Sequence, residues 1–323
     1  MKAIQITRTG GPEVLELTQL PLPEPGPGQV RLKVEAAGLN YADILTVAGE
    51  YLARTRLPLV PGMEFAGRVD ALGEGVGGLQ EGQLVAALAG QGGFAEYAVV
   101  PLRALVPVPP GLSAPQAAAF PVSYYTAYFA LVTQARARPG EWVLVQAAGG
   151  ALGTATVQVA RALGLRVIAT ASTEAKLELA RALGAEVTLL GSRPDLLEAV
   201  REATGGHGVD VLVEVVGGAG FAQSLQMLAY RGRLLVVGSA SRELAQMNPV
   251  SLMKRNQSVI GVWLTPFLAD PQALQEATAF LTPLLASGAV RPVVGKVFAL
   301  EQAAEAFAYV TGRQSSGKVV LTP

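Results

Sequence analysis

The stretch Val143-Leu-Val-Gln-Ala-Ala-Gly-Gly-Ala-Leu-Gly153 decides the fold of this chain. Val143 to Val145 form a short apolar run that suits a buried strand, and Thr154 to Leu163 carry apolar residues at helical spacing. The turn between them, Ala148-x-Gly150-x-x-Gly153, predicts a tight connection and a helix that starts near Gly153. Strand, turn and helix in this order favour a phosphate-binding turn over an ordinary strand–helix connection.

The turn matches the dinucleotide-binding fingerprint, with alanine at its first glycine position. Small residues are needed there because a pyrophosphate lies against bare backbone N–H groups at the N-terminus of the helix. A side chain at position 150 would occupy that space, and one at position 153 would push the helix away from the strand. The residues expected to contact the dinucleotide are Ala148, Gly149, Gly150, Ala151, Leu152 and Gly153.

The sequence after the turn alternates strands with helices and places glycines at strand ends, a pattern typical of a doubly wound parallel sheet. The expected strands are 166–170, 187–190, 209–216, 233–237 and 258–262, and a helix is expected over 174–183. Ligands of such α/β sheets lie across the carboxyl ends of the strands. The expected cofactor-binding set of this domain is therefore completed by Ser172, Gly217, Gly238, Ser239 and Val262.

The acidic residue that usually accompanies the fingerprint is missing. An NAD site places Asp or Glu about 20 residues beyond the glycines to bind the ribose 2′-hydroxyl, but here the second strand ends Ala169-Thr-Ala-Ser-Thr173. Glu174 follows and is expected to start the helix instead. Lys176 could reach a 2′-phosphate and Arg193 could also approach it, which favours NADPH over NADH. The alternative is that Lys176 is an ordinary solvated helix residue.

Length and composition set further bounds. The 323 residues suffice for two domains, and 25 basic residues balance 25 acidic ones, so the charge indicates neither a nucleic-acid nor a membrane-surface partner. No signal-peptide pattern and no bilayer-length apolar run occur, so a cytoplasmic protein is expected. The chain has no cysteine, which excludes thiol nucleophiles and cysteine-ligated metals. Its single histidine, His207, lies in a glycine-rich turn and is expected to be an exposed loop residue.

The first 120 residues consist of short β-like segments separated by Pro- and Gly-rich turns, which predicts an antiparallel, barrel-like domain. The expected strands are 1–6, 15–17, 29–36, 66–72, 84–88 and 95–100. Helices are expected over 113–120, 123–133 and 271–287, and a final strand, 317–322, would return to the first domain. The expected division is 1–122 with 263–323 for the substrate domain and 123–262 for the dinucleotide-binding domain.

Four motifs are distributed over the chain: Ala37-Gly-Leu-Asn-Tyr-Ala-Asp43, Pro61-Gly-Met-Glu-Phe-Ala-Gly67, Gln146-Ala-Ala-Gly-Gly-Ala-Leu-Gly153 and Ser315-Ser-Gly-Lys-Val-Val-Leu321. With these motifs the sequence resembles the zinc-free quinone oxidoreductases, the ζ-crystallin-like branch of the medium-chain dehydrogenase/reductase superfamily. The resemblance implies a GroES-like β-barrel domain beside a Rossmann domain. Zinc-dependent members carry a cysteine ligand at the position of Asn40 and a histidine ligand at that of Met63, so no metal is expected.

The resemblance also implies roles in cofactor binding. Asn40 and Thr126 would lie beside the nicotinamide, and Lys318 would belong to the same cofactor site. Ser172 and Lys176 would hold the adenosine 2′-phosphate. A tyrosine often helps there at the position that is Gly191 in this chain, and Arg193 would have to replace it.

The remaining candidates concern the acceptor side. Asp43 and Glu64 match family positions and are interpreted as structural carboxylates. Tyr51 would face the cleft, either as a catalytic proton donor or as an aromatic wall, and the sequence leaves both interpretations open.

The predicted activity is NADPH-dependent reduction of a quinone-like acceptor, with Asn40 and Tyr51 as the catalytic candidates. One alternative is reduction of the C=C bond of an enal or enoyl thioester, for which Tyr51 would donate the proton. An alternative of another class is a non-catalytic NADPH-binding protein, crystallin-like or redox-sensing. A homodimer is expected, because edge segments such as 258–262 pair across a two-fold axis in this superfamily.

Overall fold

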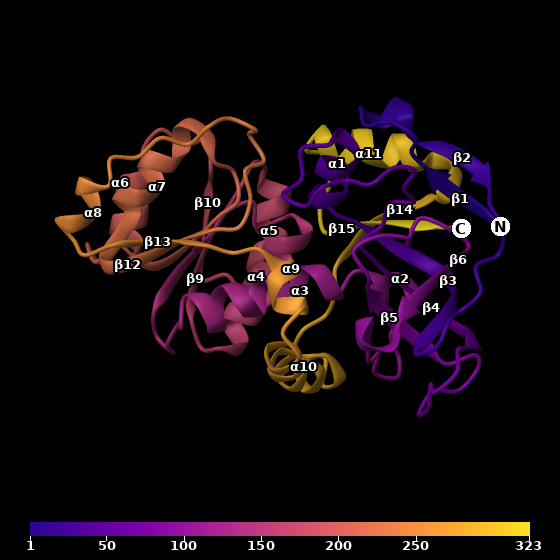
Figure 1. Cartoon of the computed structure of the whole chain (residues 1–323). Coiled ribbons are helices and arrows are strands. Elements are labelled where there is room, and N and C mark those ends of the chain that lie inside the picture. Colours follow the sequence, from indigo (N-terminus) through magenta and orange to yellow (C-terminus); the bar gives the residue numbers. More distant parts are fainter. The chain divides into compact units, whose positions relative to one another are not determined.

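In the computed structural model, which describes residues 1–323, the chain forms two compact units. The first unit comprises Met1–Val122 and Arg291–Pro323, and the second comprises Ser123–Val290 (Figure 1). None of the helices is both long enough and apolar enough to cross a membrane.

The second unit is built on a six-stranded, wholly parallel sheet with the strand order β10-β9-β8-β11-β12-β13. The strands are β8 (Trp142–Val145), β9 (Arg166–Ala171), β10 (Val187–Leu190), β11 (Val209–Glu214), β12 (Leu228–Val236) and β13 (Ser258–Gly261). The chain runs outward from β8 to β10 and then returns to place β11 on the other side of β8. This reversal confirms the predicted doubly wound sheet and puts the switch point between β8 and β11.

Four helices cover the two faces of this sheet. They are α4 (Ala151–Ala162), α5 (Glu174–Ala182), α6 (Leu196–Ala203) and α7 (Phe221–Met227). Helix α4 contacts α5, and α6 contacts α7, so each face carries one pair (Figure 1). Between sheet and helices lies an apolar core that includes the fully buried Leu212 and Leu234. The position of the core explains why the strands read as nearly continuous apolar runs.

The segment after β13 packs on the second unit through aromatic side chains. It contains α9 (Leu264–Leu268) and α10 (Pro271–Ala286), which meet α3 (Pro121–Tyr128) and the π-helical turn that continues it to Gln134. The rings of Phe129 and Phe267 stack with their centroids 4.3 Å apart, and the ring centroid of Tyr128 lies 5.3 Å from that of Phe280. These contacts group residues up to Val290 with the second unit, whereas the sequence-based division assigned residues from 263 onward to the first.

The first unit contains a mixed seven-stranded sheet. Its strands are β3 (Gln29–Leu39), β4 (Glu64–Leu72), β5 (Leu84–Leu88), β6 (Tyr97–Pro101), β7 (Leu105–Val106), β14 (Val294–Ala299) and β15 (Lys318–Thr322). The sheet is accompanied by the hairpin pair β1 (Lys2–Gln5) and β2 (Glu16–Gln19) and by α1 (Tyr41–Ala48), α2 (Ala114–Ala118) and α11 (Ala303–Thr311). As expected, the last strand returns to this unit, where β15 pairs antiparallel with β3.

The expectation of an antiparallel barrel needs correction. The strands pair along an open path, β14-β15-β3-β4-β5-β7, with β6 added on β3, and this path does not close on itself. Moreover, β14 and β15 are parallel, because α11 provides the crossover between them. The first unit is therefore a mixed open sheet, and the sequence does not predict a strand over the residues of β14.

Candidate functional site

The glycine turn in the second unit forms the N-terminus of α4. The helix begins at Ala151 with Gly150 as its N-cap, slightly before the expected start at Gly153, and no side chain caps it. The first backbone N–H groups of a helix have no partner within the helix, and the helix dipole makes this end positive. The end of α4 therefore offers donors to an anion.

The three glycines of this turn are glycine for different reasons. A Cβ on Gly153 would lie 2.3 Å from the carbonyl oxygen of Ala147, so close packing of helix and strand requires its absence. A Cβ on Gly149 would lie 2.6 Å from Cβ of Lys176. At Gly150, by contrast, φ is −81° and ψ is 175°, and a Cβ would meet only the Ala147 oxygen at 3.4 Å. Neither packing nor backbone conformation requires glycine there, so the space beside Gly150 suits a ligand.

Lys176 lies directly over this turn. Thr173 caps α5 by accepting a hydrogen bond from the Lys176 N–H at 3.4 Å, and the aliphatic stem of Lys176 packs against Gly149. Partial burial lowers the pKa of the Lys176 ammonium. The exposed Ser172 follows β9 on the same connection. The structure thus brings the predicted lysine to the glycine turn.

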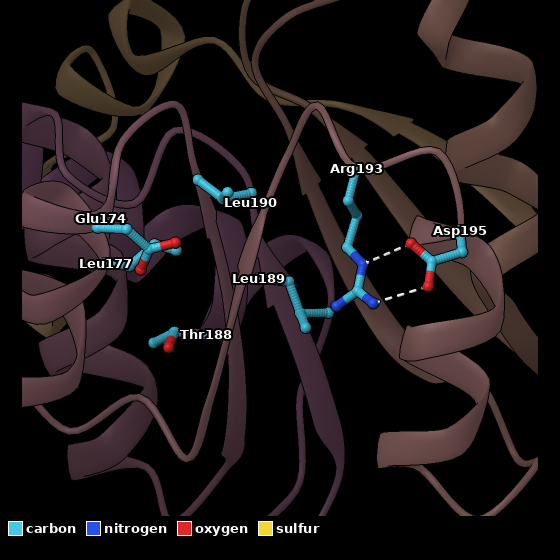
Figure 2. Close-up of a pocket in the computed structure, with 7 residues that line it drawn as sticks. All are labelled: Glu174, Leu177, Thr188, Leu189, Leu190, Arg193 and Asp195. Atoms are coloured by element: carbon cyan, nitrogen blue, oxygen red, sulfur yellow. Dashed lines mark hydrogen bonds and ion pairs between the residues drawn. The ribbon is translucent and has the colours of Figure 1, made fainter.

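Arg193 stands at a pocket of about 270 Å³ beside the edge strand β10 (Figure 2). Its guanidinium donates two hydrogen bonds to Asp195, at 2.8 and 2.7 Å. Glu174 and Leu177 of α5 line the same pocket with Thr188, Leu189 and Leu190. Arg193 is thus engaged by a neighbouring carboxylate, which the sequence analysis did not anticipate.

The loops after β11 and β12 bring together two more of the predicted residues. Gly217 adopts φ 73°, and a Cβ there would lie 2.8 Å from the hydroxyl oxygen of Ser239. Gly238 lies next to the backbone of Val215. Val262 is buried just after β13, and its N–H bonds the Val236 carbonyl at 2.9 Å. Thr126, on α3, is largely buried.

A cluster of buried charged groups occupies the first unit. Lys318, at the start of β15, donates to Glu64 Oε1 at 2.5 Å and to Asn40 Oδ1 at 2.7 Å. Asn40 Nδ2 donates to the same Glu64 oxygen at 3.0 Å, and the other oxygen of Glu64 accepts from the Val122 N–H at 2.7 Å. Lys318 and Glu64 are 1 % and 0 % exposed. The cluster fixes the orientation of the Asn40 amide.

Asp43 completes this cluster. Its carboxyl accepts hydrogen bonds from the backbone N–H groups of Asn40, at 2.9 Å, and Met63, at 3.1 Å. Burial raises the pKa of Asp43 to about 7. The interpretation of Asp43 and Glu64 as structural carboxylates agrees with these contacts. Lys318 was predicted to bind the cofactor, whereas the structure places its ammonium, fully buried, against Asn40 and Glu64.

Two further predicted residues are at least partly exposed. Tyr51 follows α1, and its backbone N–H bonds the Leu45 carbonyl at 3.2 Å. His207 lies in a turn, as expected, with its ring 2.9 Å from Asp210. Nowhere in the chain do three His, Cys, Asp or Glu side chains gather as a metal site.

A further hydrogen-bond network, not expected from the sequence, lies at the switch point. Glu214 at the end of β11, Gln146 after β8 and Ser224 of α7 are joined by hydrogen bonds of 2.7–3.0 Å. The available signal was Glu214 itself, a carboxylate directly after the apolar run Val211-Leu-Val213.

Each of the two units matches a known protein family. Residues 26–110 match the alcohol dehydrogenase GroES-like domain, and residues 151–282 match the zinc-binding dehydrogenase domain. The chain is 39 % identical over 324 residues to the quinone oxidoreductase-like protein 2 homolog of Nematostella vectensis, covering 99 % of this chain and 88 % of that protein. It is 36 % identical to the quinone oxidoreductase of Rattus norvegicus, covering 99 % and 96 %.

The chain is also similar to solved structures of quinone oxidoreductases. The quinone oxidoreductase from Thermus thermophilus, solved alone and with NADPH, is 49 % identical and has a TM-score of 0.90, with 100 % of both chains covered. The Escherichia coli quinone oxidoreductase complexed with NADPH is 28 % identical and has a TM-score of 0.92, again over 100 % of both chains.

The buried cluster predicts a large loss of stability when its cation is removed. Lys318→Met leaves Glu64 without its counter-charge, and breaking a buried ion pair from one side costs about 3–5 kcal/mol. We expect the free energy of unfolding, measured with urea, to fall by that amount. The double variant Glu64→Gln/Lys318→Met should recover part of the loss. Lys2→Met, which removes the exposed partner of Glu301, is the control and should remain close to wild type. Equal losses in Lys318→Met and Lys2→Met would contradict the assignment.

Proposed function

This chain belongs to the quinone oxidoreductase family of the medium-chain dehydrogenases and reductases, and from that premise we propose that it reduces quinone-like acceptors with NADPH and without a metal ion. The observation that carries the proposal is the glycine turn. Gly150 leaves free a space that the protein itself does not need, at the positive end of α4 and next to Gly149, against which Lys176 of α5 packs. The curated relatives and the solved structures described above, which include complexes with NADPH, support the same activity.

The residues of the second unit fit a dinucleotide. We propose that the turn from Ala148 to Gly153 binds the pyrophosphate, that Ser172 and Lys176 hold the 2′-phosphate, and that Gly217 and Ser239 contact the ribose. No carboxylate follows β9 to bind a 2′-hydroxyl, because Glu174 is the first residue of α5 and lines the neighbouring pocket. These features support NADPH over NADH.

The chemistry asked of the protein is modest. Bound NADPH supplies the hydride from C4 of its nicotinamide ring. Asn40, with its amide oriented by Glu64 and Lys318, is proposed to hydrogen-bond the nicotinamide. A quinone can take its proton from water after hydride transfer, so a site without a dedicated acid suffices. The task of the chain is then to bind and orient.

The cofactor preference can be tested at Lys176. Lys176→Ala should weaken NADPH binding by about 1–3 kcal/mol, because a charge-assisted hydrogen bond to the 2′-phosphate is lost, and should leave NADH binding unchanged. Isothermal titration calorimetry with both cofactors measures the difference. Lys254→Ala, an exposed lysine near the opposite edge of the sheet, is the matched control. An equal loss of affinity for NADPH and NADH would show that Lys176 does not bind the 2′-phosphate.

Substitution of Tyr51 can distinguish a quinone acceptor from an enal or enoyl thioester. Tyr51→Phe keeps the ring and removes the hydroxyl. We expect turnover of 1,4-naphthoquinone to stay within a few-fold of wild type, since water supplies the proton. If an enal or enoyl thioester is the substrate, loss of the general acid should cost about 10²–10⁴-fold in turnover. Tyr230→Phe, on the exposed part of β12, is the control.

Three results of this assay would redirect the assignment. A hundredfold loss with the quinone would mean that Tyr51 is the acid in quinone reduction as well. Faster wild-type turnover of enals or enoyl thioesters would favour the C=C reductase. Binding of NADPH without turnover of any acceptor would favour the crystallin-like or redox-sensing protein.

We also propose a homodimer formed along the edge of the second unit. β13 ends the strand order and pairs only with β12. The segment between these two strands exposes the apolar side chains Leu244, Val250 and Met253, with Leu244 93 % exposed, and β12 itself exposes Tyr230. An unpaired edge beside exposed apolar groups favours pairing with a second copy.

We expect sedimentation at micromolar concentration to show a dimer. The Val250→Lys/Met253→Lys variant should shift the protein toward monomer, because charges replace apolar contacts. Leu102→Lys, a partly exposed leucine of the first unit, should not. A monomeric wild type would contradict the proposal.

A further inference from the structure

A buried carboxylate without a cationic partner lies at the switch point of the parallel sheet. Glu214, the last residue of β11, is 1 % exposed. Its Oε1 accepts hydrogen bonds from the backbone N–H groups of Val216, at 2.8 Å, and Gly217, at 2.9 Å. Its Oε2 accepts from Gln146 Nε2 at 3.0 Å and from Ser224 Oγ at 2.7 Å. Four neutral donors therefore stabilise this charge.

The network joins the two strand ends on either side of the switch point. Gln146 directly follows β8 and precedes Ala147, whose φ of 49° starts the glycine turn. The Gln146 amide donates to Glu214 and accepts from the Val215 N–H at 3.3 Å. Glu214 in turn binds the next two N–H groups of the same loop. The glycine turn and the loop from Val215 to Gly217 are thus held by one pair of side chains.

The loop contains a glycine in a backbone conformation that few other residues adopt. Gly217 has φ 73° and ψ −154°, a region open mainly to glycine, and it lies against Ser239. Its N–H is fixed by Glu214 alone among side chains. Loss of this acceptor would leave buried donors unpaired and release the loop.

We propose that Glu214 and Gln146 are positioning residues for the dinucleotide, which set the spacing between the glycine turn and the Val215–Gly217 loop. The proposal rests on the proposed function, because it takes this site to bind NADPH. Neither residue is proposed to touch the cofactor. Their effect is exerted through backbone N–H groups and through the geometry of the loops that carry Gly149 and Gly217.

The chain allows an exchange experiment. Glu214→Gln replaces one carboxylate oxygen by an NH₂ group. If that group takes the place of Oε2, it faces the donors Gln146 Nε2 and Ser224 Oγ, and the Gln146 amide loses its acceptor. The double variant Gln146→Glu/Glu214→Gln reverses the direction of the central bond and keeps an acceptor for Val215, Val216 and Gly217. Ser224 can reverse as well, because a hydroxyl both donates and accepts. A matched control is Asp210→Asn, because Asp210 accepts from the Trp142 N–H at 2.8 Å and so joins the same two strands near their amino ends.

We expect Glu214→Gln to weaken NADPH binding, measured by fluorescence titration, by about tenfold or more, as for the loss of buried hydrogen bonds. In the apoprotein, hydrogen exchange of the Val216 and Gly217 amides should accelerate. The double variant should restore both quantities to within a few-fold of wild type. Asp210→Asn should leave NADPH binding unchanged even if it lowers the melting temperature.

Several results would overturn the positioning role. These are wild-type NADPH affinity in folded Glu214→Gln, no recovery in the double variant, or an equal loss of affinity in Asp210→Asn. A wild-type protein that does not bind NADPH would overturn the proposed function and this proposal together. If Glu214→Gln does not fold, Ser224→Ala, which removes one donor to Glu214, provides the comparison. It should weaken NADPH binding less but accelerate the same amides, and unchanged affinity and exchange would overturn the proposal.

Discussion

The close approach of α4 to the end of β8 is the constraint on which the second unit depends. A Cβ on Gly153 would lie 2.3 Å from the carbonyl oxygen of Ala147 and 2.5 Å from Cα of Ala148, so no other residue fits without moving the helix. Once the helix sits there, its unpaired N–H groups face outward from the carboxyl end of the central strand. Lys176 can then lie across Gly149, because that position also lacks a side chain. The close packing of this helix on its strand thus also brings the uncapped N-terminus of α4 next to Lys176.

Each unit also contains a buried network that includes a carboxylate, and these two networks balance charge differently. In the first unit, the Lys318 ammonium faces Glu64, while the raised pKa of Asp43 keeps much of that second carboxyl protonated near neutral pH. In the second unit, Glu214 has only neutral donors. Burial of a charge is costly unless its hydrogen bonds are satisfied, and every buried side-chain polar atom of the chain has a partner. Satisfied networks of this kind rigidify the backbone segments that they connect.

Elements that depend on local sequence signals could be predicted, whereas features that depend on contacts between distant residues could not. Strands 84–88 and 187–190 were predicted with their observed bounds, because short apolar runs between turn residues are local signals. The start of α4 was placed too late, because Gly150 serves as N-cap without a capping side chain. The strand that ends at Glu214 was predicted to continue to 216, because apolar residues follow the glutamate and the turn depends on hydrogen bonds from the N–H groups of Val216 and Gly217 to its side chain.

Contacts between residues far apart in the chain could not be predicted from a single sequence. Asn40 and Lys318 are 278 residues apart, and no local sequence pattern indicates that their side chains form a hydrogen bond. The motifs that contain them suggested cofactor binding for both, which the contacts of Lys318 do not favour. The parallel pairing of β14 with β15 likewise depends on a crossover through α11 that only the fold reveals.

The contacts of Lys318 bear on the choice of acceptor. The family resemblance places the ligands of zinc-dependent members at Asn40 and Met63, whereas here a lysine ammonium lies between Asn40 and Glu64. This ammonium is 1 % exposed and donates to Asn40 and Glu64, so it can orient the Asn40 amide. In the proposed reaction, the acceptor would then have to be polarised by its own electron deficiency. A quinone meets this requirement because its two conjugated carbonyls already favour hydride addition. An unactivated ketone would need an electrophile that these residues do not provide.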